Sequence, residues 1–136
     1  MNQQATILFL CVHNAGRSQM AAAFARQIGA GRVQVISAGS SPSERLNPAV
    51  VSAMAEVDLD ISNESPKELT NEMALDADVI VTMGCGDACP VYPAKRYEDW
   101  DLADPAGQDI DVVRTIRDQI EQRVRTLISQ LEAASS

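Results

Sequence analysis

The chain has 136 residues, a length at which one domain can bury most of its apolar surface without disulfide bonds or metal ions. Its 19 acidic residues outnumber 11 basic ones, and the net charge is -8 at pH 7. This charge repels nucleic acid and anionic lipid, so we expect neither as a partner. A small anionic substrate would need a locally concentrated set of hydrogen-bond donors to overcome the same field. We predict a single domain over residues 1–136 that is monomeric.

The N-terminal segment and the cysteine content both favour a cytoplasmic protein. Residues 1–6 carry no basic stretch, and the apolar run over residues 7–12 is too short to span a membrane or to act as a signal peptide. Three cysteines without an export signal indicate a reducing compartment, where thiols are more often buried, catalytic or redox-active than structural. An odd number of cysteines also argues against a disulfide framework.

The first half of the chain alternates strands with helices. The run ILFLCV over residues 7–12 is typical of a strand buried on both faces of a parallel sheet. From Arg17 to residue 28 the apolar residues recur with helical spacing, which predicts a helix. Residues 33–38 alternate and are β-branched, which predicts a second strand. Asn47 and Pro48 then have the cap and first-turn preferences of a helix that ends near residue 57.

The second half continues the same alternation. A short helix is predicted around residues 70–75, and the apolar run over residues 78–83 predicts a third strand. Residues 95–100 predict a short fourth strand, and residues 103–107 predict a turn. Strands that alternate with helices specify an α/β sheet covered by helices, with ligand chemistry expected beyond the carboxyl ends of the strands.

A long amphipathic helix is predicted to close the chain over residues 109–131. Its apolar residues keep a helical stripe that begins at Val112 and ends at Leu131, and this stripe is expected to face the core. Arg114 and Arg117 belong to the charged set that we place outside the stripe.

The segment CVHNAGRS, from Cys11 to Ser18, joins the first strand to the first helix. A short strand-to-helix loop can aim successive backbone N–H groups inward as an anion site, with the positive end of the helix dipole behind them. Arg17 can offer two parallel donors to an oxyanion, and Cys11 in the same positive field is expected to be a thiolate at neutral pH. Ser18 can donate to that sulfur, Asn14 is suited to stabilise the loop, and Gly16 eases its tight backbone.

We therefore predict an oxyanion-binding loop. Its members are Val12, His13, Asn14, Ala15, Gly16, Arg17 and Ser18. The alternative is that Cys11 simply continues the buried strand and Arg17 is a solvated first-turn residue. The strand before the loop and the helix start after it favour the anion site.

The segment CVHNAGRSQM resembles the phosphate-binding loop of the low-molecular-weight protein tyrosine phosphatase family, in which C-x5-R-S follows the first strand. The resemblance extends over nearly the whole chain and implies a four-stranded parallel sheet flanked by helices. It also implies that Asp104, which precedes Pro105, is the general acid. Within the family, the chain looks most like the arsenate reductases.

Two features favour the reductase branch over the phosphatases. The phosphatases continue the acid loop with aromatic residues that grip a phosphotyrosine ring, whereas here Pro105 is followed by the small or polar residues 106–108. The segment MGCGDACP also places Cys85 and Cys89 four apart, which looks like the redox pair of the thioredoxin-coupled reductases. The resemblance thus implies a relay of three thiols that begins at Cys11.

The implied substrate is arsenate, with phosphate or sulfate as competing oxyanions, and the implied external electron donor is thioredoxin. A low-molecular-weight thiol such as mycothiol, or a glutaredoxin-type partner, is the other coupling considered. We predict no bound cofactor and no metal site, because zinc prefers four ligands and His13 is the only histidine. The alternatives are a low-molecular-weight protein tyrosine phosphatase, a small phosphomonoesterase, or an oxyanion-binding or thiol-sensor protein without turnover.

Overall fold

The computed structural model describes residues 5–84 and 96–135. Its elements in chain order are β1 (Ala5–Cys11), α1 (Arg17–Gly29), β2 (Val33–Gly39), α2 (Pro48–Ala55), α3 (Asn71–Asp76), β3 (Val79–Thr82), β4 (Arg96–Asp99) and α4 (Ile110–Ser135). These bounds agree with the sequence prediction to within a few residues at each end. Among the described residues, no helix is both long and apolar enough to cross a bilayer.

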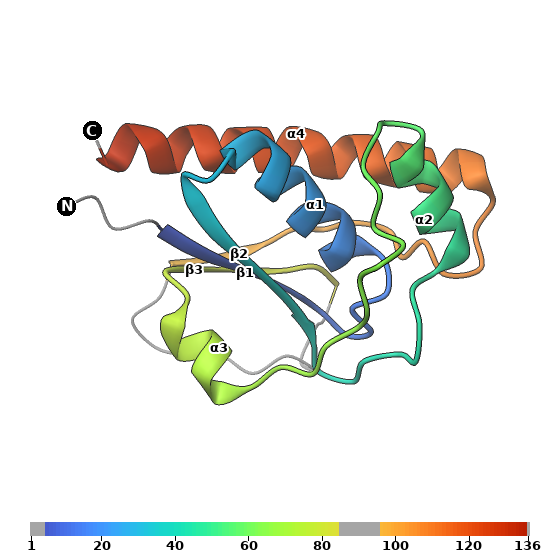
Figure 1. The fold of residues 1–136 in the computed structure, drawn as a ribbon, viewed down its shortest axis with the longest axis horizontal. Helices are drawn as coiled ribbons and strands as arrows, with labels where there is room; N and C mark the ends of the chain where they lie inside the picture. The colour runs from blue at the N-terminus through green and yellow to red at the C-terminus, as the bar shows by residue number, and fades with distance from the viewer. Residues whose placement is uncertain (1–4, 85–95, 136) are drawn as a thin grey trace.

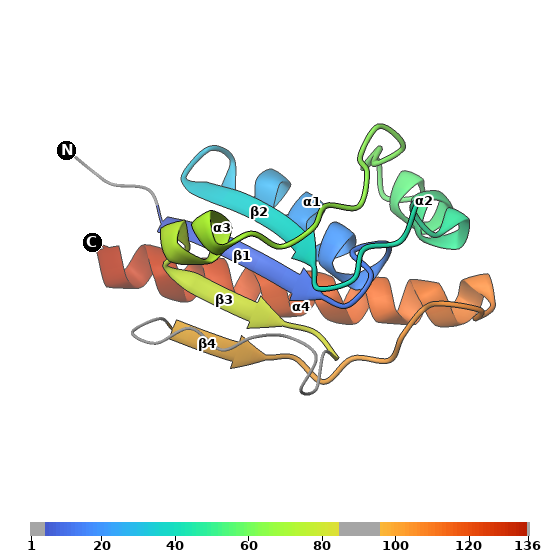
Figure 2. The same ribbon diagram turned by 90° about the horizontal axis from the view of Figure 1, so that it is seen from below.

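The strands form one parallel sheet in the order β2-β1-β3-β4. All four arrows point the same way, so their carboxyl ends meet at one edge of the sheet (Figure 2). This confirms the predicted α/β fold with a four-stranded parallel sheet and flanking helices. In such a sheet the loops that follow the strands converge at that edge, where ligands are expected to bind.

Residues of β1 alternate between two cores, which explains why the strand is continuously apolar. Ile7, Phe9 and Cys11 belong to the larger core, which contains buried residues of α1, α2 and α4. Leu8 and Leu10 belong to the smaller core on the opposite face, which includes Ala74 of α3. Figure 1 shows the corresponding layers, with α1, α2 and α4 on one side of the sheet and α3 on the other. The central strand is therefore covered on both faces, as its sequence predicts.

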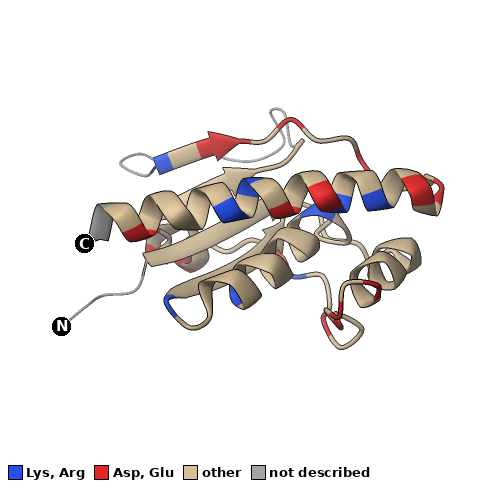
Figure 3. Cartoon of the chain, turned by 90° about the horizontal axis from the view of Figure 1, so that it is seen from above, with Lys and Arg blue, Asp and Glu red and all other residues tan. Residues whose placement is uncertain are grey.

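Two residues of α4 differ from the sequence prediction. Val112 is 38% exposed although it was placed in the buried stripe, because it lies in the first turn of the helix, at the end of the stripe. Arg117 is only 9% exposed although it was placed outside the stripe. Figure 3 shows that basic and acidic residues are spaced along the outer side of α4.

Arg117 is buried because it makes hydrogen bonds that join α4 to α2. Its Nη1 donates to the carbonyl of Ala53 and to Oε1 of Glu56, each at 2.9 Å. Arg114 adds a bidentate pair to the same carboxylate, at 2.9 and 2.6 Å for its Nε and Nη2. Glu56 thus pairs with two guanidinium groups, and the helical pattern alone could not reveal a buried cation whose partner caps another helix.

The hydrogen bond from Arg114, aided by Arg117, holds the pKa of the Glu56 carboxyl well below its usual 4.5, at about 2. Because the pKa is lower in the folded state, the ion pair stabilises the fold fully above pH 4.5 and loses this contribution as the pH falls through 2. We expect Glu56→Gln to lower the Tm at pH 7, with a difference from wild type that shrinks between pH 4.5 and pH 2. Circular dichroism melts across this range measure it.

Glu44→Gln is the matched control, because it removes the same charge from an exposed loop position. If both variants have the same Tm at pH 7, the ion pair between Glu56 and the two arginines does not stabilise the fold.

Candidate active site

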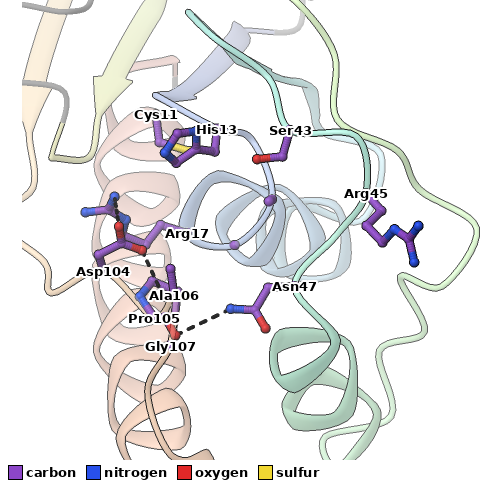
Figure 4. A pocket seen from close by; sticks show the side chains of 12 residues that line it. Cys11, His13, Arg17, Ser43, Arg45, Asn47, Asp104, Pro105, Ala106 and Gly107 are labelled. Atoms are coloured by element: carbon purple, nitrogen blue, oxygen red, sulfur yellow. Dashed lines mark hydrogen bonds and ion pairs between the residues drawn. The ribbon is translucent and has the colours of Figure 1, made fainter.

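A cavity of about 290 Å³ lies at the carboxyl edge of the sheet. Cys11, the last residue of β1, and Arg17, the first residue of α1, lie in its wall. Asp104 and Pro105 line it from the segment between β4 and α4 (Figure 4). Cys11 and Asp104 lie 93 positions apart in the sequence, and both reach this cavity because the carboxyl ends of the parallel strands meet at one edge of the sheet.

Hydrogen bonds to the segment between β2 and α2 fix the orientation of the loop after β1. In this outer segment, residues 40–47, four backbone N–H groups donate to the carbonyls of loop residues 11, 12, 13 and 15. The pairs are Ser40 with Cys11 (3.2 Å), Ser41 with Val12 (2.8 Å), Ser43 with His13 (3.0 Å) and Asn47 with Ala15 (3.0 Å). These carbonyl oxygens consequently point away from the cavity and towards the outer segment.

The peptide N–H groups of the loop must then point the other way. Across a trans peptide the carbonyl of one residue and the N–H of the next are oppositely directed, and none of the described peptide bonds is cis. The N–H of Asn14 shows this directly, because it donates to the Cys11 sulfur at 3.3 Å. The N–H groups of residues 12, 13 and 16 share this inward direction. The first N–H groups of α1 lie behind them without intrahelical partners, so together they form a set of donors suited to an oxyanion.

Asn14 adopts a left-handed backbone conformation, with φ of 51°, and is completely buried. Its Oδ1 accepts from the Lys67 N–H at 2.8 Å and from Gln19 Nε2 at 3.1 Å. Since Oδ1 accepts two hydrogen bonds, Nδ2 must be the atom that donates to Ser18 Oγ, at 2.7 Å. The predicted role of Asn14 in stabilising the loop is supported by these contacts.

The Ser18 hydroxyl lies 2.9 Å from the Cys11 sulfur. Because Asn14 already donates to Ser18 Oγ, the hydroxyl proton is free to point at the sulfur. The sulfur thus faces two donors, the Ser18 hydroxyl and the Asn14 N–H. Both stabilise a negatively charged sulfur, and Cys11 is itself only 2% exposed.

Arg17 reaches from α1 to the segment that carries Asp104. Its Nη1 donates to the carbonyl of Leu102 at 3.1 Å, and its Nη2 lies 3.8 Å from Asp104 Oδ2. The Asp104 carboxylate is 53% exposed, and its Oδ1 accepts from the Ala106 N–H at 3.0 Å. The guanidinium is therefore fixed by a carbonyl that no sequence pattern marks, while its remaining N–H groups can serve an anion.

Two glycines at the site allow a close approach of other groups. The sequence suggested that Gly16 eases the loop backbone, but its φ is -143°, outside the left-handed region. It is needed because a Cβ there would come within 2.9 Å of the Pro105 ring. At Gly84, with φ of 74°, a Cβ would overlap the guanidinium of Arg17. Gly84 is also the residue that precedes Cys85 in the sequence.

The remaining predicted loop residues lie around the cavity. His13 is exposed and lines the cavity, with Nδ1 3.3 Å from the Ser41 carbonyl oxygen. Ala15 also lines the cavity, whereas Val12 is half-buried behind it. Among the described residues that line the cavity there is no phenylalanine, tyrosine or tryptophan, and the His13 imidazole is the one aromatic ring (Figure 4).

Cys85 and Cys89 lie outside the described residues, so their predicted pairing stays a prediction. Within residues 5–84 and 96–135, no three histidine, cysteine or carboxylate side chains are grouped closely enough to hold a metal ion.

Sequence reasoning missed Gln19, Lys67, Leu102 and Asn47 as parts of the site. Leu102 and Lys67 contribute backbone groups, which leave no mark in a residue pattern. Gln19 is completely buried and its amide donates to the Asn14 carbonyl, but a polar residue at a helix start gives no sign of this in the sequence. Asn47 was recognised only as a helix cap, since its contacts with the loops depend on the tertiary fold.

Asn14→Ala should lower the free energy of unfolding by about 2–4 kcal/mol. It removes buried hydrogen bonds and places alanine at a positive φ. Asn14→Gly should recover about 1 kcal/mol of this loss, because glycine tolerates the backbone conformation but cannot restore the bonds. Urea unfolding with an unchanged m-value measures both. Wild-type stability in the two variants would show that the Asn14 contacts do not stabilise the loop.

A comparison with family models matches residues 6–136 to the low molecular weight phosphotyrosine protein phosphatase family. Among curated proteins, the glutaredoxin arsenate reductase of Synechocystis sp. is 40% identical over 128 residues, which cover 92% of this chain and 97% of that protein.

Solved structures give the same result. A thioredoxin-dependent arsenate reductase from Corynebacterium glutamicum superposes with a TM-score of 0.82 and 38% identity, covering 98% of this chain. This chain spans only 64% of that longer one. An arsenate reductase in the phosphate binding state superposes with a TM-score of 0.85 and 38% identity, covering 93% of this chain and 98% of the other. The chain therefore belongs to the low molecular weight phosphotyrosine protein phosphatase family, and within it these relatives are arsenate reductases at 38–40% identity.

Proposed function

We propose that the chain reduces arsenate to arsenite, with Cys11 as the nucleophile. The observation that carries this proposal is the position of the Cys11 sulfur, which faces two hydrogen-bond donors at the wall of a donor-rich cavity without Phe, Tyr or Trp among its described lining. Such a cavity suits a small tetrahedral oxyanion and, beyond the His13 imidazole, offers no ring to grip an aryl ester. The identity to curated and solved arsenate reductases supports the same substrate.

In the first step the Cys11 thiolate attacks arsenic, and a sulfur–arsenic bond forms as an arsenic–oxygen bond breaks. The inward N–H groups of the loop and Arg17 hold the oxyanion oxygens and stabilise the charge that develops on them. Asp104, 3.8 Å from the Arg17 guanidinium, donates a proton to the departing oxygen, which leaves as water. The product is a Cys11 adduct of arsenic in its oxidised, pentavalent state.

In the second step the Cys85 thiolate attacks the Cys11 sulfur. A disulfide forms, the sulfur–arsenic bond breaks, and its electron pair reduces arsenic to the trivalent state, so that arsenite leaves. Cys89 then attacks Cys85, which releases Cys11 as a thiolate and leaves a disulfide between Cys85 and Cys89. The contact of Gly84 with Arg17 supports this order, because Cys85 is the next residue in the chain.

An external dithiol must then reduce the disulfide, and we assign this role to thioredoxin. The four-residue spacing of Cys85 and Cys89 supports it, as does the thioredoxin-dependent relative. The alternative is a low-molecular-weight thiol with a glutaredoxin-type partner, the coupling indicated by the name of the Synechocystis relative. We place the reaction in the cytoplasm, where thioredoxin and glutathione keep thiols reduced.

A phosphatase is the second candidate, because the family model describes phosphotyrosine phosphatases and the same loop could hold a phosphoryl group. A phosphatase would use Cys11, Arg17 and Asp104 in the same places but would not need Cys85 or Cys89.

The test couples the full chain to thioredoxin, thioredoxin reductase and NADPH. We expect arsenate-dependent NADPH oxidation that falls by about 10³-fold or more in Cys11→Ser, because the nucleophile is lost. Arg17→Lys keeps the positive charge but not the paired donors, and should lower turnover by about 10²-fold. Turnover of p-nitrophenyl phosphate without any response to arsenate would refute the reductase and favour the phosphatase. Full activity in Cys11→Ser would remove Cys11 from the mechanism.

A further inference from the structure

Asn47 contacts the oxyanion-binding loop, the first turn of α2 and the segment that carries Asp104. Its backbone N–H donates to the carbonyl of Ala15 in the oxyanion-binding loop, at 3.0 Å. Its Oδ1 accepts from the Ala49 N–H at 2.9 Å and so caps α2. Its Nδ2 donates to the carbonyl of Pro105 at 3.4 Å, across the mouth of the cavity (Figure 4).

The contact with Pro105 matters because the Asp104 side chain is held mainly by its own segment. Its Oδ1 accepts from the Ala106 N–H at 3.0 Å, two residues on, while its Oδ2 lies 3.8 Å from Arg17 in an exposed ion pair, which fixes a side chain only weakly. Its position relative to the loop therefore depends on how the whole segment is held. Pro105 is the adjoining residue, and it is buried, with its ring against Gly16 on one side and its carbonyl bonded to Asn47.

Asn47 and Gly16 thus connect the segment of Asp104 to the loop of Cys11. Asn47 bonds to that loop through Ala15 and to the Asp104 segment through Pro105. Gly16, a member of the loop, packs so closely against the Pro105 ring that there is no room for a Cβ. The separation of the carboxylate from the reacting sulfur is set by these contacts, together with the hydrogen bond from Arg17 to the Leu102 carbonyl, rather than by a direct bond between Cys11 and Asp104.

We propose that Asn47 is a positioning residue that holds the Asp104 segment over the oxyanion-binding loop. The proposal rests on the proposed function, in which Asp104 protonates the departing oxygen. Small displacements of a proton donor lower the rate of the step it assists while leaving binding of the anion intact. Asn47 therefore governs turnover, whereas the affinity for the oxyanion is set by the loop N–H groups and Arg17.

The two side-chain roles of Asn47 can be separated by substitution. Asn47→Ser retains a hydroxyl that can cap α2 but is too short to reach Pro105, while Asn47→Ala loses both contacts. Thr70→Ala is the matched control, because Thr70 caps α3 through the Met73 N–H and does not line the cavity. It should lower the Tm without changing turnover.

The experiment measures the single-turnover rate with arsenate, the KM for arsenate, inhibition by inorganic phosphate and the Tm, in the full chain. We expect Asn47→Ser to keep the Tm and to lower the rate about tenfold, with KM and phosphate inhibition within about twofold of wild type. Asp104→Asn should lower the rate about 10²-fold. If Asn47 acts through Asp104, adding Asn47→Ser to the Asp104→Asn variant should lower its single-turnover rate by less than about twofold.

A wild-type rate in Asn47→Ser would overturn the positioning role while leaving the proposed function intact. The role would also be overturned if Asn47→Ser lowered the rate by the same factor in the wild type and in Asp104→Asn, because Asn47 would then act independently of Asp104. A wild-type rate in Asp104→Asn would instead refute the acid step of the proposed function, and the role of Asn47 with it.

Discussion

The site depends on one set of hydrogen bonds, between the carbonyls of the loop after β1 and the N–H groups of the segment after β2. Once the carbonyls of residues 11, 12, 13 and 15 are held outward, planar trans peptides turn the intervening N–H groups inward. Donors of this kind need no charged side chain, which is how an acidic protein with a net charge of -8 can still hold an oxyanion. The outer segment is therefore as much a part of the site as the loop that contains Cys11.

A second constraint fixes the sulfur within this loop. Asn14 takes the left-handed conformation that closes the turn, and its amide donates to Ser18 Oγ, which leaves the hydroxyl proton free to point at Cys11. Arg17, in contrast, is fixed from outside the loop, by the Leu102 carbonyl and by contact with Gly84. The Cys11 sulfur and the Arg17 guanidinium are thus positioned by different parts of the chain. The segment of Asp104 joins them through Pro105, which contacts Gly16 and Asn47.

Sequence patterns predicted the strands and helices because each has a simple local cause, such as the apolar run of β1 or the Asn47 cap of α2. They also predicted Cys11, Arg17 and Ser18 as neighbours, since strand, tight loop and helix follow one another directly. Three kinds of feature could not be predicted from sequence patterns. Backbone acceptors such as Leu102 have no residue signature, Arg117 is buried only because Glu56 lies on another helix, and Gly16 is required by a proline 89 residues away. Asp104 was placed by family resemblance rather than by any local pattern.

The most direct test of the three-thiol relay is to map the disulfides that form when the reduced protein meets arsenate without any external reductant. Mass spectrometry of the digested protein should find Cys85 joined to Cys89 and Cys11 as a free thiol, and in Cys89→Ser it should find Cys11 joined to Cys85. Arsenite should appear in equal amount to the disulfide, because each disulfide supplies two electrons. Arsenite formed while Cys85 and Cys89 both remain reduced would contradict the relay.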